Sequence, residues 1–336
     1  MSNHSRIGNI DWRRDALFIV LSIVTIIITI VILLESGLAK ARYEPPKYPF
    51  YLIISEFVFL AQISLIGVRL SIIFNRGMRF KINTADLIKV VAAQVYMSLL
   101  IPGFYIGGEV ITITYLTYKG LPTARVTEGI VLRYTVDTIT LTLMILIFYL
   151  FSLTTVPFIA FVMAVVLFVV YMVLFISIVS ARLGRYIERM FRFISSRVNI
   201  ARNFIVANEN ETYGVSFTAI DYLVLFILSA TQWLLSGLNV TLIFYALGVN
   251  TNFIIGVLIM LSYTVLTYIS LLPGSAGIGE LANLYILNNL GLSNYYLAYD
   301  VWFRIITYII PLIILMPLFL GITRRLTINI SHRNLQ

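Results

Sequence analysis

Apolar residues fill long stretches of the chain, and six of these runs have the length of a membrane-spanning helix. A helix needs about 20 residues to cross the roughly 30 Å of hydrocarbon in a bilayer. The runs cover residues 16–34, 50–72, 129–151, 156–180, 219–246 and 300–322. The pattern therefore predicts an all-α polytopic membrane protein with six spanning helices.

Two further apolar segments, 87–118 and 253–290, are each interrupted by a Pro-Gly pair. Proline breaks a helix because it lacks a backbone donor and clashes with the preceding turn. Most of the halves on either side are too short to cross the bilayer, although 253–272 is long enough to span. We expect both segments to be re-entrant hairpins that enter and leave by one face.

The composition supports a single membrane domain over residues 1–336 and excludes several chemistries. Of the 336 residues, 60% are hydrophobic and only 12% are charged, which is typical of polytopic membrane proteins. The chain has no cysteine, and its two histidines, His4 and His332, lie in polar tails. It also lacks the G-x-x-x-x-G-K-[ST] phosphate loop. We therefore expect no cofactor, no bound metal and no thiol chemistry.

The net charge of +9 does not indicate nucleic-acid binding, because the basic residues lie in the loops. With the N-terminus inside, nineteen of the 24 basic residues, Arg69 among them, fall in cytoplasmic segments. Cytoplasmic loops carry such an excess, so both termini are expected inside a multi-pass protein of the cell membrane. In the basic cytoplasmic loop at 182–213, residues 182–202 have the pattern of an amphipathic helix on an anionic lipid surface.

The phrase P-G-x-x-x-x-G-E occurs twice, at 102–109 and at 273–280, which are 171 positions apart. The same offset relates Arg133 to Arg304. Each half of the chain holds three predicted spans and one hairpin, and since three is odd, the second half must be inverted relative to the first. Inverted repeats with broken helices are a recurrent plan of secondary transporters. The predicted repeats and their hairpins are 12–151 with 87–118, and 152–325 with 253–290.

Each copy of the phrase predicts a site for an anion. The second half-helix should begin near the glutamate, and a helix N-terminus offers free N–H groups and a positive dipole end. An arginine adds a permanently charged, forked donor that suits phosphate oxygens. The predicted substrate-binding residues are Gly103, Gly108, Glu109, Arg133, Gly274, Gly279, Glu280 and Arg304. In an alternative interpretation, each glutamate caps its own half-helix and pairs with the arginine of the same repeat.

Two other acidic residues in apolar sequence are candidates for proton coupling, Asp137 and Glu56. Asp137 could instead pair with Arg133 one helical turn away. Glu56 could instead form an interhelical hydrogen bond. Asp221 and Asp300 fall near predicted helix starts, where we expect them to act as caps.

The paired phrases, the downstream Gly-Leu and the following arginine resemble the lysylphosphatidylglycerol synthase transmembrane region family, also called flippase-like domain proteins. The likeness covers residues 12–325; the second phrase is the stronger match, while the first departs by having Phe104 and Tyr105 after Pro-Gly. The resemblance implies a translocator of anionic or polyprenyl-linked lipids. Family members that modify phospholipids carry an aminoacyltransferase domain; this chain stops at Gln336 without one, so aminoacyl transfer is not expected.

The function expected from the sequence is translocation of an anionic phospholipid or a polyprenyl-phosphate-linked lipid between leaflets. One alternative is an intramembrane lipid-phosphate transferase that uses Glu109 or Glu280 as general base. Another is a membrane scaffold for a glycosyltransferase partner. An enzyme is disfavoured, because the apolar region contains no histidine, no cysteine and no clustered carboxylates.

Overall fold

A computed structural model of the chain describes residues 45–100, 108–151, 157–179, 217–268, 270, 275 and 277–333. Within these residues the fold is entirely helical, without strands, which confirms the predicted all-α class. The first predicted span, 16–34, and the basic loop 182–213 with its amphipathic part 182–202 lie outside the described residues.

Five helices of the described part are long and apolar enough to cross a membrane. They are α2 (Phe50–Ser71) continued by the π-helical η2 (Ile72–Gly77), α5 (Thr123–Phe151), α6 (Phe158–Val179), α8 (Ala219–Ala246), and a continuous run of η4 (Ser293–Tyr295), α11 (Tyr296–Arg304), η5 (Ile305–Ile309) and α12 (Ile310–Arg333). They correspond to the five predicted spans after the first. The spans of α5 and of the last run begin before the predicted positions 129 and 300, because polar first turns precede the apolar sequence.

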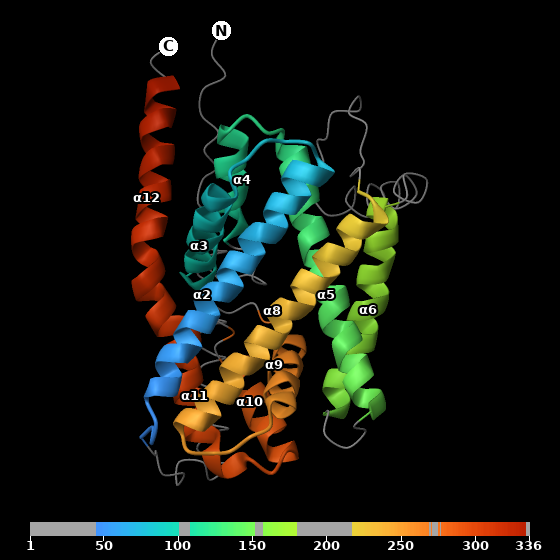
Figure 1. Ribbon diagram of the computed structural model, residues 1–336, viewed down its shortest axis with the longest axis vertical. Coiled ribbons are helices and arrows are strands. Elements are labelled where there is room, and N and C mark those ends of the chain that lie inside the picture. Colours follow the sequence, from blue (N-terminus) through green and yellow to red (C-terminus); the bar gives the residue numbers. More distant parts are fainter. Residues whose placement is uncertain are drawn as a thin grey trace, which may run out of the picture.

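Four shorter helices form two pairs. They are α3 (Thr84–Leu100) with α4 (Glu109–Tyr118), and α9 (Phe253–Thr267) with α10 (Ile278–Asn289). At 1.5 Å per residue even the longest of them, with 17 residues, extends only about 26 Å, less than the hydrocarbon thickness. In Figure 1, α3 and α4 occupy the upper half of the bundle, whereas α9 and α10 occupy the lower half. The two pairs therefore lie toward opposite ends of the long helices.

The offset of 171 positions relates whole elements as well as the two sequence phrases. Adding 171 to the bounds of α2 gives 221–242, which falls within α8. The same shift carries the start of α3 to 255, of α4 to 280 and of α5 to 294, each within two residues of the start of α9, α10 and η4. Within the described residues, α2, α3, α4 and α5 therefore have counterparts in the same order in the second half.

A glycine allows close helix packing at the same place in each half, between α2 and α3 in the first half and between α8 and α9 in the second. A Cβ on Gly67 of α2 would lie 2.7 Å from the Cα atom of Ile88 in α3. Gly237 of α8 lies similarly close to the backbone of Val257 in α9. Such glycines are typical of helix contacts in membranes, where close backbone packing replaces the hydrophobic driving force. The backbone of α2 therefore packs closely against α3, and that of α8 against α9.

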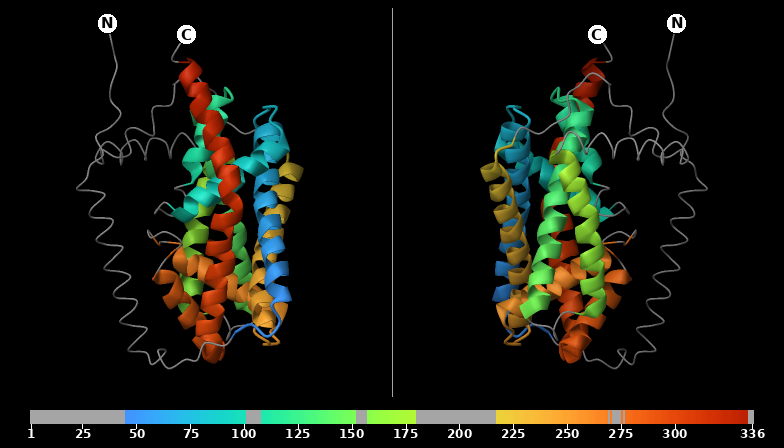
Figure 2. Two further views of the ribbon diagram at one scale, coloured as in Figure 1. Left: turned by 90° about the vertical axis from the view of Figure 1, so that its left-hand side faces the viewer. Right: turned by 90° about the vertical axis from the view of Figure 1, so that its right-hand side faces the viewer.

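The buried apolar residues form separate clusters around the two helix pairs. One cluster combines α3 and α4, as in Val91 and Leu116, with side chains of α2, α5 and α12. The other combines α9 and α10, as in Ile259 and Ile286, with side chains of α2, α8 and α11. In the side views, α2 and α8 run side by side along most of their length (Figure 2), and they make the most extensive helix contact of the described part. The contact between these equivalent helices joins the two halves.

Candidate functional site

The first helix pair places a carboxylate and a guanidinium together in the protein interior. Glu109 is the first residue of α4, and Arg133 of α5 donates to its Oε1 atom through Nη2. The same oxygen accepts from the amide of Gln94 at 2.7 Å and from the hydroxyl of Tyr134 at 2.9 Å. The side chains of Glu109 and Arg133 are only 2% and 4% exposed. This pair is therefore closed to solvent and lipid.

Two polar atoms of the first pair remain without a hydrogen-bond partner among the described residues. They are the Oε2 atom of Glu109 and the Nε atom of Arg133, both buried. Buried polar groups are usually satisfied, so an unpaired nitrogen in a buried guanidinium is unusual. Arg133 thus keeps part of its forked donor set unused, which an oxyanion could engage.

The second helix pair repeats the ion pair in a more open setting. Arg304, the last residue of α11, donates to Oε1 of Glu280 through Nε at 2.9 Å and through Nη2 at 2.6 Å. The other carboxylate oxygen accepts from the backbone N–H of Gly277 at 2.6 Å, at the start of α10. The side chains of Arg304 and Glu280 are 19% and 20% exposed. The two equivalent pairs therefore differ in access.

The structure contains the pairing that the alternative interpretation describes. Each glutamate pairs with the arginine of its own repeat, 24 positions further along the chain. Glu280 also caps its helix, whereas no side chain caps α4, which begins at Glu109. Capping therefore accounts for part of the role of Glu280, but not for that of Glu109.

The predicted glycines at the second helix of each pair lie against these residues. A Cβ on Gly108 would overlap the carbonyl oxygen of Gln94 and the hydroxyl of Ser98. A Cβ on Gly279 would lie 2.7 Å from Nη2 of Arg304 and 2.7 Å from the hydroxyl of Tyr263. Only glycine, which has no side chain, allows the neighbouring groups to approach this closely at both positions. Gly103 and Gly274 lie outside the described residues.

A third buried charge pair was missed by the sequence analysis. Arg69 of α2 donates to the Oδ1 atom of Asp137 in α5 and to the amide oxygen of Gln232 in α8. Ser229 of α8 donates to the same Asp137 oxygen at 2.6 Å. The Arg69 side chain is 1% exposed, so its placement in a cytoplasmic loop is wrong. The predicted pairing of Asp137 with Arg133 is also wrong, since Asp137 pairs with Arg69.

The prediction that Asp221 caps a helix is confirmed. Its carboxylate accepts from the backbone N–H of Thr218 at 3.0 Å, and the Thr218 hydroxyl accepts from the Asp221 N–H at 3.3 Å. The same prediction is wrong for Asp300, which lies inside α11 and is buried. Asp300 accepts from the amide of Asn283 in α10 at 2.7 Å, one helical turn from Arg304. The second half-site thus contains a carboxylate that the first lacks, since position 129 is Gly129.

Glu56 stands apart from the three pairs. It lies in α2 and is 9% exposed, yet neither carboxylate oxygen has a hydrogen-bond partner among the described residues. Interhelical hydrogen bonding was the alternative role for this residue. That role is found instead at Gln62, whose amide oxygen accepts from Ser236 of α8 at 2.8 Å.

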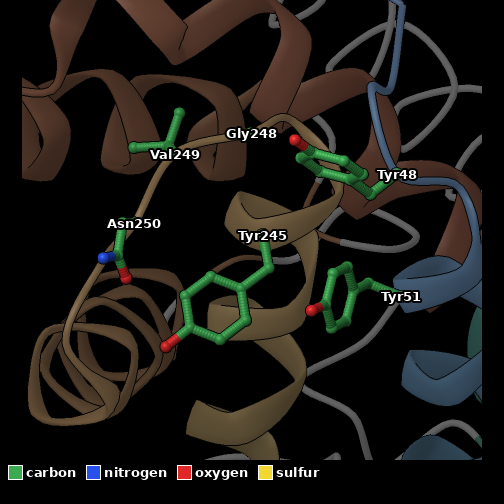
Figure 3. Close-up of a pocket in the computed structure, with 6 residues that line it drawn as sticks. All are labelled: Tyr48, Tyr51, Tyr245, Gly248, Val249 and Asn250. Carbon is green, nitrogen blue, oxygen red and sulfur yellow. The ribbon is translucent and has the colours of Figure 1, made fainter.

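A recess of about 260 Å³ opens at the lower end of the bundle, where α2 begins and α8 ends. It is lined by Tyr48, Tyr51, Tyr245, Gly248, Val249 and Asn250 (Figure 3). The rings of Tyr51 and Tyr245 meet edge to face, with centroids 5.6 Å apart. Tyrosines at the end of a span are typical of anchoring at the membrane–water interface. The recess does not include the residues of the ion pairs.

The five apolar spans and the buried charges between them define a multi-pass membrane protein with an ionic interior. Comparison with known proteins gives the family: the lysylphosphatidylglycerol synthase TM region family matches the chain over residues 16–314. The chain belongs to this family, whose name associates it with a lipid.

A UPF0104 membrane protein from Methanocaldococcus jannaschii is similar in sequence, with 33% identity over 122 residues. The match covers 35% of this chain and 52% of the relative. The chain therefore spans about half the length of the relative that it matches.

Proposed function

We propose that this protein translocates an anionic phospholipid or a polyprenyl-phosphate-linked lipid between the leaflets of the cell membrane. Glu109–Arg133 and Glu280–Arg304 are the two headgroup sites, and an arriving phosphate takes the arginine from its glutamate. The single observation that carries the proposal is the repeated ion pair. Each of the two equivalent ion pairs has its glutamate in the first turn of the second helix of a short helix pair, and the two helix pairs lie toward opposite ends of the bundle.

The proposal includes a topology in which both short pairs are re-entrant hairpins of an inverted repeat. α9 has only 15 residues, about 22 Å of helix, which supports a hairpin rather than a full crossing over 253–272. α2 and α12 end and α5 begins at the upper end in Figure 1, where basic side chains concentrate: Arg76, Arg79, Lys81, Lys119, Arg125 and Arg324. The opposite end contributes Lys47 among the described residues. This asymmetry supports a cytoplasmic upper end.

The difference in access between the two pairs supports movement of a headgroup in steps. Arg133 is sealed, whereas Arg304 is about one-fifth exposed, so the two sites are not open together in this conformation. A transporter must avoid a continuous polar path, and alternating access by rocking of one repeat against the other meets that requirement. A headgroup would therefore leave one arginine before the other becomes accessible, while its acyl chains stay in the bilayer.

Carrier activity accounts for the carboxylates better than phosphate transfer does. A general base must reach the reacting proton, and acid and base must converge on one substrate. Glu109 and Glu280 lie in the first turns of helices that belong to pairs at opposite ends of the bundle, and each is bonded to its own arginine. Such an arrangement provides two binding positions along a path rather than one reaction centre.

A leaflet-resolved assay in proteoliposomes tests the proposal. Tail-labelled NBD-phosphatidylglycerol and a labelled polyprenyl phosphate serve as probes, with dithionite quenching of the outer leaflet as readout. Arg133→Ala combined with Arg304→Ala should abolish protein-dependent movement of at least one probe. Arg76→Ala combined with Arg324→Ala removes two exposed arginines and should leave the rate unchanged. Unaltered movement in the first variant would reject the carrier mechanism and favour a scaffold.

A further inference from the structure

Polar residues form a regular ladder along the contact between α2 and α8. Ser55, Gln62 and Arg69 are each seven positions apart on α2, so they share one face of the helix. Their partners on α8 are Asn239, Ser236 and Gln232, respectively. The ladder joins the two halves of the molecule at three levels, and the Arg69 level continues into Asp137 of α5.

Several atoms beside this ladder are buried without a hydrogen-bond partner among the described residues. They are both carboxylate oxygens of Glu56, Nε2 of Gln62 and Nε of Arg69. All three residues belong to α2 and span 13 positions, about 20 Å along the helix axis. Orphaned buried polar groups mark places where water or a proton can be accommodated. Glu56 is the one carboxyl among them.

The face of α2 that contains Glu56 is turned toward the interior of the molecule. Ile63 and Gly67 follow it by two and three helical turns on the same face, and Gly67 lies against Ile88 of α3. Glu56 is nine-tenths buried, so lipid does not cover its carboxyl group. An ionised carboxylate with no donor at this depth is strongly disfavoured, and burial without a partner is compatible with the neutral, proton-carrying form.

The charged groups of the helices packed against α2 are engaged elsewhere or are remote. On α5, Arg125 pairs with Glu128, Arg133 with Glu109 and Asp137 with Arg69. On α8, Asp221 caps the far end of the helix. On α3, Asp86 and Lys89 lie near Ile88, about 16 Å along α2 from Glu56.

The remaining titratable groups of these packed helices are hydroxyls. They are Tyr96 on α3, Tyr134 and Tyr149 on α5, Tyr222 and Tyr245 on α8, and Tyr308 on η5, which follows the paired Arg304. A tyrosine hydroxyl does not ionise near neutral pH in model peptides. Among the described residues of these helices, the cations are therefore paired with other carboxylates or remote from Glu56.

We propose that Glu56 is a proton-binding site that couples lipid movement to a proton gradient. The inference rests on the proposed translocation and names its coupling ion. A proton suits the site better than a metal cation, because the described residues contain no group of three or more acidic or histidine side chains that could hold a metal ion. In the proposed topology Glu56 lies in the outer half of α2.

The coupling step is a simple protonation cycle. The Glu56 carboxylate accepts a proton from water at the outer surface and becomes a carboxylic acid, and the acid later returns that proton to water on the cytoplasmic side. Protonation removes the charge that opposes close packing of α2 in the interior. The conformation described here, with Glu56 buried and unpartnered, corresponds to the protonated state.

Two measurements on Glu56→Gln test the proposal independently. The first is infrared difference spectroscopy of purified protein on titration, following the carbonyl band of a protonated carboxylic acid. Wild-type protein should show a titrating band that the variant lacks. Glu128→Gln, which removes a carboxylate paired with Arg125 at 3.0 Å, is the matched control and should keep the band. A band that is the same in wild type and Glu56→Gln overturns the proton site, whether or not the protein moves lipid.

The second measurement is the NBD-lipid assay with and without a pH gradient across the vesicle. A one-unit gradient can shift a proton-coupled distribution by up to about tenfold per proton. Wild type and Glu128→Gln should respond to the gradient, and Glu56→Gln should move lipid at a rate that the gradient does not change. A gradient response that survives in Glu56→Gln overturns the coupling role. If the Arg133→Ala and Arg304→Ala variant still transports while Glu56→Gln loses the response, the headgroup sites fail and the proton site stands.

Discussion

Arg69 and Asp137, which are 68 positions apart, form an ion pair that joins α2 to α5. Gln232 and Ser229 of α8 add one hydrogen bond each, to Arg69 and to Asp137, so the pair links the first half of the molecule to the second. The pair has no counterpart in the second repeat, because the equivalent positions are Val240 and Tyr308. The two halves share their helices and their Glu–Arg pairs but differ in what surrounds them.

Removal of one member of this pair should destabilise the protein strongly. Arg69→Ala leaves the largely buried Asp137 carboxylate without its cation, and such losses typically cost about 3–5 kcal/mol. The midpoint of thermal unfolding in detergent, followed by circular dichroism, measures the effect. Arg76→Ala is the control, since its pair with Asp221 is 3.5 Å long and Arg76 is 66% exposed, so a change below about 1 kcal/mol is expected. Equal shifts in the two variants would contradict the structural role assigned to Arg69.

Most of the helical framework could be predicted because bilayer thickness imposes a length on every apolar run. The prediction for 219–246 coincides with α8, and those for 50–72 and 156–180 lie close to α2 and α6. The start of α5 was placed too late, because Arg125 and Glu128 interrupt the apolar pattern. Those two residues pair with each other three positions apart, so the helix continues through them.

The repeated pair of glutamate and arginine could be predicted because an internal duplication marks equivalent positions without any knowledge of contacts. The buried position of Arg69 could not be predicted. Arg69 lies near the end of its apolar run, and a count of basic residues assigns it to the cytoplasmic side. The helix continues through the π-helical η2 to Gly77, so Arg69 lies about two turns before the end of the helix instead of at its end. Its partner Asp137 is too far along the chain for any local pattern to reveal the contact.

Substitution of the two site glycines should separate stability from activity. Gly108→Ala places a Cβ against the backbone carbonyl of Gln94, which cannot move easily, so the variant should unfold at a lower temperature. Gly279→Ala places its Cβ against the ends of two flexible side chains, Arg304 and Tyr263, which can shift. It should remain folded but slow lipid movement.

Gly321→Ala is the control for both glycine variants, because a Cβ at Gly321 meets nothing within 4 Å. It should match wild type in thermal unfolding and in the proteoliposome assay. Loss of stability in Gly279→Ala equal to that in Gly108→Ala would show that Arg304 is held rigidly and would argue against its release to a substrate.

The inverted topology predicts that equivalent positions label from opposite sides of the membrane. The chain has no native cysteine, so Thr123→Cys and Asn294→Cys, 171 positions apart and both exposed, can be labelled singly. A membrane-impermeant maleimide applied to intact cells should modify only the Asn294 position. Lys81→Cys should behave like Thr123→Cys, and Lys47→Cys like Asn294→Cys. Labelling of Thr123→Cys and Asn294→Cys from one common side would refute the inverted repeat.

The forked geometry at the second pair predicts that Arg304→Lys is not a conservative change. Two nitrogens of Arg304, Nε and Nη2, reach the same Glu280 oxygen at 2.9 Å and 2.6 Å, and a lysine ammonium cannot reproduce that fork. A hydrogen bond to a charged group contributes about 1.5–3 kcal/mol, so lipid movement should slow by roughly tenfold or more. Arg324→Lys changes an exposed arginine of α12 and should match wild type. If both lysine variants transport equally well, Arg304 acts only as a positive charge, and the forked recognition of a phosphate has to be abandoned.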